Sequence, residues 1–357
     1  MRHLGVMVPL RPSMYLRRSL VSLPFPLDEP GCGLYSLARQ ALWNGIQRLG
    51  IAEGDEILVP AYHCGSEVEV LDRLGIVPRF YSATDTLEPD AGELESLRGP
   101  RTRALYLIHY LGFPQDAARW KAWADERELL LLEDAAQGWL STQEGAPVGS
   151  FGALCIFSLY KSFGLPDGGA VVVPGSLPQP GRDRLGARGA VRETAAWASW
   201  RIGWPRPTAP ARETYDVEKD FELGDPNLRA SRLTRWLLPR VADPTAAETR
   251  RANFRQLFES LEDLVPPEFS RMPPGASPFL FPVGVGDKVR FRSEMYRRGV
   301  GSTDFWSVAH RALPVERFPS ARRLRERIVG LPVHQELGPA GLARVADAAR
   351  RAAGAAR

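Results

Sequence analysis

Two spacings of apolar residues alternate along the first half of the chain. From Ser36 to Leu49 the spacing is helical, which is typical of a helix with one buried face, and Gly50 follows as the residue that ends it. Ser36 is expected to be the N-cap of this helix. Short apolar runs elsewhere predict buried strands. The clearest is Leu129–Glu133, which contains four consecutive leucines and is therefore apolar on both faces.

The same two patterns alternate as far as residue 173, with short connections between them. Such alternation predicts an α/β fold with a doubly wound, mostly parallel sheet at about residues 31–180. The other expected strands are Glu56–Tyr62, Val77–Ser82, Ala104–His109, Ala153–Ser158 and Ala170–Val173, and the other expected helices are Val68–Leu74 and Gln115–Arg127.

The flanking segments predict an arm and a second unit. Residues 1–30 contain five prolines and are expected to form an irregular N-terminal arm. Residues 174–226, rich in Pro, Gly, Arg and Trp, are expected to be an irregular, partly helical excursion from a large domain at residues 31–240. A smaller C-terminal α+β domain is expected at residues 241–357. The later expected elements are the helices Asn227–Leu238, Thr245–Leu261, Val289–Arg298 and Leu342–Ala353 and the strand Phe279–Val285.

Composition narrows the class of protein. The 357 residues are 44% hydrophobic and 25% charged, which excludes a disordered, collagen-like or coiled-coil chain. No apolar run approaches the roughly 20 residues that span a bilayer. The basic residues are 42 arginines and only four lysines, and they do not cluster beside aromatic residues as nucleic-acid binding requires. Three widely spaced cysteines fit neither a disulfide framework nor a zinc site. We expect a cytoplasmic protein that binds no metal, membrane or nucleic acid.

Polar side chains follow the predicted strands at the points where the strands end. Because ligands of an open parallel sheet bind outside the carboxyl ends of its strands, these residues are expected to meet at one edge and to form an active site. They are Tyr62, His63 and Cys64; His109 and Tyr110; Glu133, Asp134 and Gln137; and Ser158, Tyr160 and Lys161.

Lys161 and Asp134 form a pair with a specific chemical meaning. A lysine at a strand end can form a Schiff base with a cofactor aldehyde. A carboxylate at a neighbouring strand end can keep a pyridine nitrogen protonated, and the ring then stabilises negative charge at the substrate's α-carbon. In pyridoxal 5'-phosphate (PLP) enzymes a lysine and a carboxylate have these two roles. The cofactor phosphate would need a helix N-terminus, which the helix beginning near Ser36 could supply.

Six short segments form an ordered set over some 300 residues. They are Leu49–Tyr62 (LGI, GDE and VPAY), Glu133–Gln137 (EDAAQ), Gly149–Gly152 (GSFG), Phe157–Gly169 around Lys161, Asn227–Leu233 (NLR) and Leu331–His334 (LPVH). Together they resemble the DegT-type (DegT/StrS-like) family of fold-type I PLP enzymes, best known as sugar aminotransferases. The resemblance covers about residues 33–350 and implies the fold-type I PLP-transferase fold.

The resemblance implies a role for each matching residue. Lys161 forms the internal aldimine and shuttles a proton, and Asp134 pairs with the pyridinium nitrogen. Gln137 lies against the cofactor ring near its 3-hydroxyl, and Ser158 donates to the phosphate. Backbone amides near Arg39 and Gln40 cap the same phosphate. Asn227 reaches the phosphate of the partner subunit, which implies a homodimer whose active sites are shared between subunits.

Four segments depart from the family pattern. One of them is the loop between Ser158 and Lys161, which is two residues shorter than the family's common form. The phosphate-binding turn is Leu37-Ala38-Arg39-Gln40. It keeps the backbone amides but loses the family's hydroxyl contact, and Arg39 either compensates as a phosphate partner or points to solvent. Cys64 falls where the family often has an aromatic ring over the cofactor, and the adjacent His63 is the candidate to stack in its place. Asp304-Phe305-Trp306 stands where a His-Tyr pair often lies near the substrate. This last departure predicts an altered substrate pocket.

The resemblance implies a PLP-dependent aminotransferase. The expected donor is glutamate or glutamine, and the expected acceptor is a keto sugar or another secondary-metabolite ketone. Two alternatives stay open. One is another PLP-dependent carbanion reaction on the same scaffold, by a lyase, cyclase or condensing enzyme. The other is a protein that binds PLP without catalysis.

Overall fold

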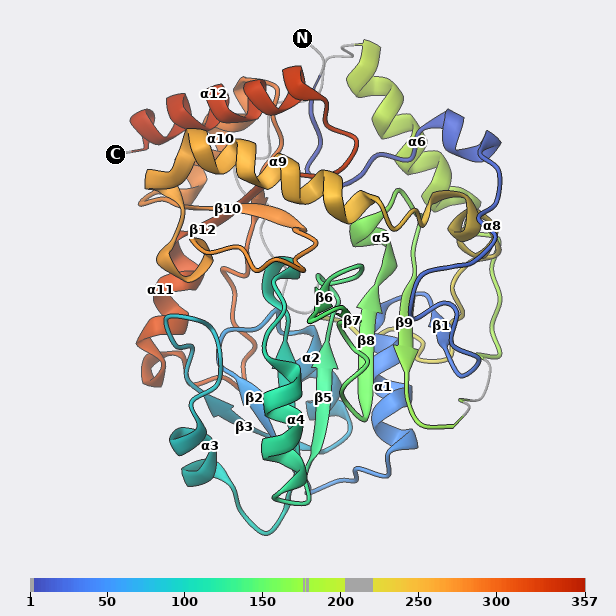
Figure 1. Ribbon diagram of the computed structural model, residues 1–357, viewed down its shortest axis with the longest axis vertical. Helices are drawn as coiled ribbons and strands as arrows, with labels where there is room; N and C mark the ends of the chain where they lie inside the picture. The colour runs from blue at the N-terminus through green and yellow to red at the C-terminus, as the bar shows by residue number, and fades with distance from the viewer. Residues whose placement is uncertain (1–2, 176, 178–179, 203–220, 357) are drawn as a thin grey trace.

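A central seven-stranded sheet dominates the computed structural model, which describes residues 3–175, 177, 180–202 and 221–356 (Figure 1). The strand order is β1-β9-β8-β5-β4-β2-β3. Strands β3, β2, β4, β5 and β8 run parallel, whereas β9 is antiparallel to both β8 and β1. The predicted mostly parallel sheet is thus confirmed. Its strands are β1 (Gly33–Tyr35), β2 (Glu56–Pro60), β3 (Val77–Tyr81), β4 (Thr102–Ile108), β5 (Leu130–Asp134), β8 (Leu154–Ser158) and β9 (Gly169–Val172).

Helices cover both faces of this sheet, and the side chains of β4, which point alternately to the two faces, illustrate this. Leu105 and Leu107 pack with α3 (Ala91–Leu97) and α4 (Ala117–Asp125) on one face. Tyr106 and Ile108 point to the opposite face, which holds α1 (Ala38–Arg48) and α2 (Ser66–Arg73). Successive side chains of a strand point to opposite faces, so a strand that is apolar throughout must be covered twice.

A three-stranded antiparallel sheet of order β10-β12-β11 forms from the C-terminal part of the chain. In Figure 1, α9 crosses in front of it and α12 lies along the same end of the molecule. The predicted strand and helices are present, whereas β11, α11 and β12 were not expected. The elements are α9 (Ala246–Leu261), β10 (Leu280–Gly284), α10 (Lys288–Arg297), β11 (Thr303–Asp304), α11 (Pro319–Arg327), β12 (Ile328–Pro332) and α12 (Pro339–Ala355).

The remaining elements are α8 (Arg232–Val241), which was expected as a helix, and others that are short or lie in the segments expected to be irregular. Residues 203–220, which include Trp204 and Lys219, lie outside the described residues, so the tryptophan-rich part of the excursion is only partly seen. No helix among the described residues is long and apolar enough to cross a membrane. The domain boundaries stay a prediction. These elements are α5 (Leu159–Ser162), α6 (Ala187–Ile202), α8 (Arg232–Val241), the β6–β7 hairpin (Thr142–Gln143 and Ala146–Pro147), and 3-10 turns at Pro12–Leu16, Tyr110–Gly112, Glu262–Leu264, Pro267–Phe269 and Val315–Arg317.

The predicted starts of α1 and α8 are wrong for a reason that the contacts show. The N-cap of α1 is Leu37, because the Ser36 hydroxyl accepts a hydrogen bond from Arg184 (2.5 Å) instead of capping the helix. The helix expected from Asn227 begins at Arg232, where Ser231 Oγ accepts from the Thr234 N–H (3.2 Å). Tertiary pairing of the preceding residues with the sheet edge replaces the extra helical turn.

Candidate active site

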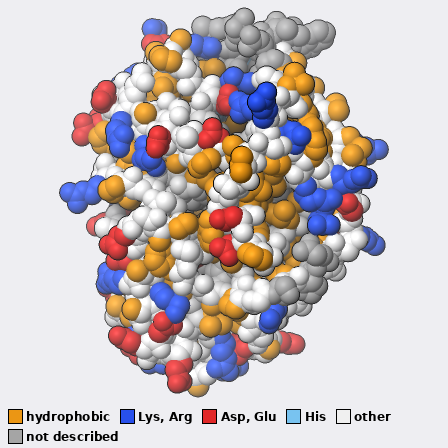
Figure 2. All heavy atoms as spheres, turned by 45° about the vertical axis from the view of Figure 1, so that its right-hand side comes forward, with side chains coloured by type: hydrophobic (Ala, Val, Ile, Leu, Met, Phe, Trp, Pro, Cys, Tyr) orange, Lys and Arg blue, Asp and Glu red, His pale blue; other side chains and the backbone are white. Residues whose placement is uncertain are grey.

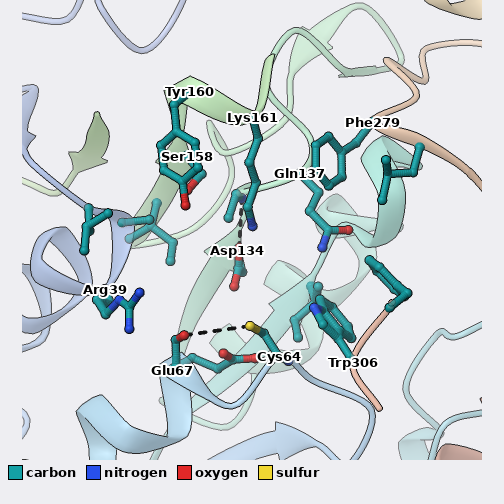
Figure 3. A pocket seen from close by; sticks show the side chains of 18 of the residues that line it. Arg39, Cys64, Glu67, Asp134, Gln137, Ser158, Tyr160, Lys161, Phe279 and Trp306 are labelled. Atoms are coloured by element: carbon teal, nitrogen blue, oxygen red, sulfur yellow. Dashed lines mark hydrogen bonds between the residues drawn. The ribbon is translucent and has the colours of Figure 1, made fainter. Parts of the chain in front are cut away.

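A cavity of about 370 Å³ opens at the carboxyl ends of β5 and β8, between the two sheets. The N-termini of α1 and α2 contribute to its wall, as does the turn after β11. The strand-end prediction therefore located the cavity. Figure 3 shows its labelled lining residues: Arg39, Cys64, Glu67, Asp134, Gln137, Ser158, Tyr160, Lys161, Phe279 and Trp306.

Asp134, the last residue of β5, is a buried carboxylate with fixed orientation. Its Oδ2 accepts a hydrogen bond from the Tyr106 hydroxyl (2.9 Å), and its Oδ1 accepts from the Ala136 N–H (2.8 Å). Burial raises the pKa of Asp134 above its usual value, while the Ala136 N–H, Lys161 and the Tyr106 hydroxyl act in the opposite direction. Each oxygen keeps a free lone-pair direction, so the carboxylate can still accept a ligand's N–H.

Lys161 lies on α5, the single helical turn that follows β8. Its Nζ lies 5.8 Å from the centre of the Phe279 ring. Lys121 pairs with Asp125 on the surface, and Lys288 is buried against Asp304. Of the lysines that the structure describes, Lys161 alone lines this cavity.

The N-terminus of α1 faces the cavity through Leu37, Ala38 and Arg39. A glycine in β9 makes this approach possible: a Cβ on Gly169 would lie 2.3 Å from the Ala38 nitrogen. The first amide N–H groups of a helix have no intrahelical acceptor, and they present the positive end of the helix dipole. An anionic group can therefore bind here, beside the buried Ser158.

Gln137, Cys64 and Arg39 also line the cavity, as expected from their sequence positions. Gln137 Oε1 accepts the Leu111 N–H (2.7 Å), which fixes the amide group at the cavity wall. Burial raises the pKa of the Cys64 thiol, so this side chain is neutral near pH 7. Arg39 donates to the carbonyl of Glu222 (2.9 Å), at the rim.

Four of the residues expected at the strand ends do not line this cavity: Tyr62, His109, Tyr110 and Glu133. They are buried and bond to one another instead. The His109 ring pairs with Glu133 (3.0 Å), and the Tyr110 hydroxyl donates to the Tyr62 carbonyl (2.7 Å).

His63, Gln40 and Asn227 also lie outside this cavity. The His63 ring is fully buried and stacks on Phe80 (5.6 Å between ring centres), because it follows a strand that is buried on all sides. The Gln40 side chain turns away to the Leu37 N–H and the Leu223 carbonyl. Asn227 is exposed in the single chain and is not among the lining residues.

Glu67 is a lining residue that sequence reasoning missed. It lies in the first turn of α2, where an acidic residue is common because it stabilises the helix N-terminus. One feature of the sequence could have indicated Glu67 as a site residue: it lies three residues after Cys64, in the segment that follows β2. Trp306 also lines the cavity, in agreement with the altered pocket predicted from its segment.

The residues present fit PLP. A half-buried lysine, a buried and oriented carboxylate, and a helix N-terminus beside a buried serine meet at one cavity. These are the groups needed for an aldehyde, a pyridine nitrogen and a phosphate, respectively.

Residues 36–192 match the DegT/DnrJ/EryC1/StrS aminotransferase family. This match confirms the DegT-type resemblance. GDP-perosamine synthase of Escherichia coli O157:H7 is 32% identical over 135 residues, and the alignment spans only 37% of either chain. UDP-N-acetyl-3-dehydro-alpha-D-glucosamine 3-aminotranferase of Acidithiobacillus ferrooxidans is 25% identical over 327 residues, which cover 87% of this chain and 81% of the relative.

Solved structures of aminotransferases share the fold. Aminotransferase TlmJ from Streptoalloteichus hindustanus has a TM-score of 0.65 at 23% identity and covers 90% of this chain and 85% of its own. The PLP-form of the putative sugar aminotransferase Spr1654 from Streptococcus pneumoniae has the same TM-score at 16% identity and covers 97% and 90%. The predicted fold-type I PLP-transferase fold is therefore confirmed.

Proposed function

We propose that this DegT-type protein is a PLP-dependent aminotransferase that moves an amino group from glutamate or glutamine to a keto sugar or a related secondary-metabolite ketone. The observation that carries the proposal is the convergence of Lys161, Asp134 and the N-terminus of α1 on one cavity. The names of the relatives support an acceptor of the sugar class, since two of them are a perosamine synthase and a glucosamine aminotransferase.

PLP bound in this cavity would supply the electron sink that stabilises negative charge at the α-carbon of the amino donor. Lys161 would hold the cofactor aldehyde and afterwards move a proton with its Nζ. Asp134 would keep the ring nitrogen protonated, and its hydrogen bonds to Tyr106 and Ala136 hold the carboxylate in place. The amides of Ala38 and Arg39, with the Ser158 hydroxyl, would bind the phosphate.

The visible absorption spectrum tests this proposal. The wild-type protein incubated with PLP is expected to become yellow, and borohydride is expected to bleach it and fix the cofactor mass on the peptide containing Lys161. Added glutamate or glutamine should then convert unreduced holoprotein to its amino form and release one equivalent of the 2-oxo acid.

Two outcomes would contradict the proposal. A holoprotein that binds PLP at Lys161 but exchanges no amino group with either donor would favour another PLP-dependent carbanion reaction, for which Cys64 and Trp306 at the cavity are the motivating departures. A protein that never takes up PLP would leave a non-catalytic role.

We also propose that the active protein is a homodimer, with Asn227 of each chain completing the phosphate site of the other. The exposure of Asn227 in the single chain supports this, because a partner-binding residue must be free in the monomer. Lys161→Ala and Asn227→Ala variants, each with reduced activity, are expected to regain up to about a quarter of wild-type activity when unfolded and refolded together, since half of the dimers would be mixed and would have one intact site. Activity equal to the mean of the separate variants would contradict a shared site.

A further inference from the structure

Glu67 is an ionisable side chain of the cavity for which the proposed reaction has no role. It lies in the first turn of α2 with 5% of its surface exposed. Its Oε1 accepts the Cys64 N–H (2.9 Å), and its Oε2 accepts the Gly65 N–H (3.1 Å). Figure 3 shows the Glu67 side chain below Asp134, on the wall opposite Lys161.

The charged groups around Glu67 come from several elements. Asp134 of β5 and Lys161 of α5 share its cavity, and Arg325 of α11 lies behind the same wall. Burial, and after it the negative charge of Asp134, raises the pKa of Glu67 to about 7, although the backbone N–H groups and Lys161 act in the opposite direction. Arg39 of α1, Tyr160 of α5 and Asp304 of β11 also line the cavity. Further titratable groups of this region are the Cys64 thiol and the buried hydroxyls of Tyr62, Tyr106 and Tyr110, whose pKa values burial raises.

The buried His63 ring lies beside Glu67 and can serve either charge state of this side chain. Its Nδ1 lies 3.8 Å from Glu67 Oε1, and neither ring nitrogen has a hydrogen-bond partner among the described residues. Burial lowers the pKa of His63 well below its usual value, so the ring stays neutral. A neutral imidazole has one donor and one acceptor nitrogen, and the tautomer can change. Nδ1 can thus donate to a carboxylate or accept from a carboxylic acid after a small closing movement.

We propose that Glu67, backed by His63, is a positioning residue that sets the protonation state of the Lys161 nitrogen. The inference rests on the proposed function, because it concerns the nitrogen that would hold the cofactor. With Glu67 protonated, Asp134 and Lys161 balance each other's charge. Release of the Glu67 proton adds a negative charge to the same cavity, which favours a protonated nitrogen at Lys161.

A spectrophotometric titration of the PLP-loaded protein tests this inference without turnover. In Glu67→Gln the Lys161-linked chromophore is expected to lose its proton about one pH unit lower than in wild type. Glu69→Gln is the matched control. It removes a carboxylate from the same helix, but Glu69 pairs with His310 and Arg73 away from the cavity, so its titration should equal that of wild type. Identical titrations for Glu67→Gln and wild type would overturn the inference.

A second measurement tests Glu67 in the cofactor-free protein. Because the pKa of Glu67 is higher in the folded than in the unfolded chain, its stabilising contribution is present at low pH and is lost as pH rises through about 7. His63→Phe keeps the stacking on Phe80 and the two backbone contacts of Glu67, so it is expected to fold. It is also expected to make the loss of unfolding free energy between about pH 5 and pH 8 steeper, because the ring can then no longer offer an N–H to the carboxylate.

The two measurements separate the possible failures. Absence of PLP binding would contradict the proposed function, and the denaturant titrations would still test Glu67. PLP binding with an unchanged chromophore titration in Glu67→Gln would contradict the inference alone. An unchanged pH slope in His63→Phe would exclude His63 as the partner of Glu67.

Discussion

Replacing Lys161 by alanine is expected to lower transamination by about 10³-fold or more and to abolish borohydride-stable attachment of PLP. Lys161 alone among the described lysines lines the cavity, so no neighbouring amine can take over the attachment or the proton transfer. The substitution should leave folding intact, because the side chain is only half-buried and is not needed by α5 for its backbone hydrogen bonds.

Lys121→Ala provides the matched control for this prediction. It also removes one lysine, but from an exposed pair with Asp125 on α4. Peptide mass spectrometry after reduction should find the cofactor on Lys161 in wild type and in Lys121→Ala, and on no peptide in Lys161→Ala. Full activity of Lys161→Ala, or a cofactor attached elsewhere, would exclude Lys161 as the attachment site.

The central sheet could be predicted because its sequence signal is local. The four leucines of Leu129–Glu133 must be buried on both faces of the sheet. The segments before and after them have helical spacing, which predicts helices that can cover the sheet. The small sheet was harder. Its middle strand, Ile328–Pro332, contains glycine and proline and has no alternation, and a Cβ on Gly330 would lie 2.6 Å from the Leu280 side chain. Its strand character comes from pairing with β10, which is a tertiary effect.

The cavity could be located from strand ends, but the direction of each side chain could not. His63 and Cys64 are adjacent in sequence, and only Cys64 faces the cavity. The backbone amide of Gln40 was expected at the phosphate, but it donates to the Leu37 carbonyl (3.1 Å), and the Gln40 side chain accepts the Leu37 N–H (3.1 Å). Glu67 resembled an ordinary helix-start residue. It is buried in a cavity whose other walls come from distant parts of the chain, such as Asp134 and Lys161, and the local sequence pattern does not show that packing.

Arg250 joins the lysine turn to the C-terminal part of the chain. The guanidinium is 1% exposed on α9, and burial lowers its pKa to about 10. It donates to the Ser162 carbonyl (2.5 Å) and the Gln335 amide oxygen (2.8 Å), with a longer contact to the Pro278 carbonyl (3.4 Å). Ser162 is the residue after Lys161, so these hydrogen bonds fix the position of α5 between the two sheets.

Arg250→Ala is therefore expected to lower the free energy of unfolding by about 3 kcal/mol, because it leaves buried oxygen acceptors unpaired and opens a cavity. Urea unfolding of the cofactor-free protein measures this loss. Arg255→Ala, on an exposed position of the same helix, should stay within about 0.5 kcal/mol of wild type. Because α5 loses its anchor, Arg250→Ala should also retain PLP less tightly in dialysis even where it remains folded. Wild-type stability in Arg250→Ala would show that the buried guanidinium does not hold these segments together.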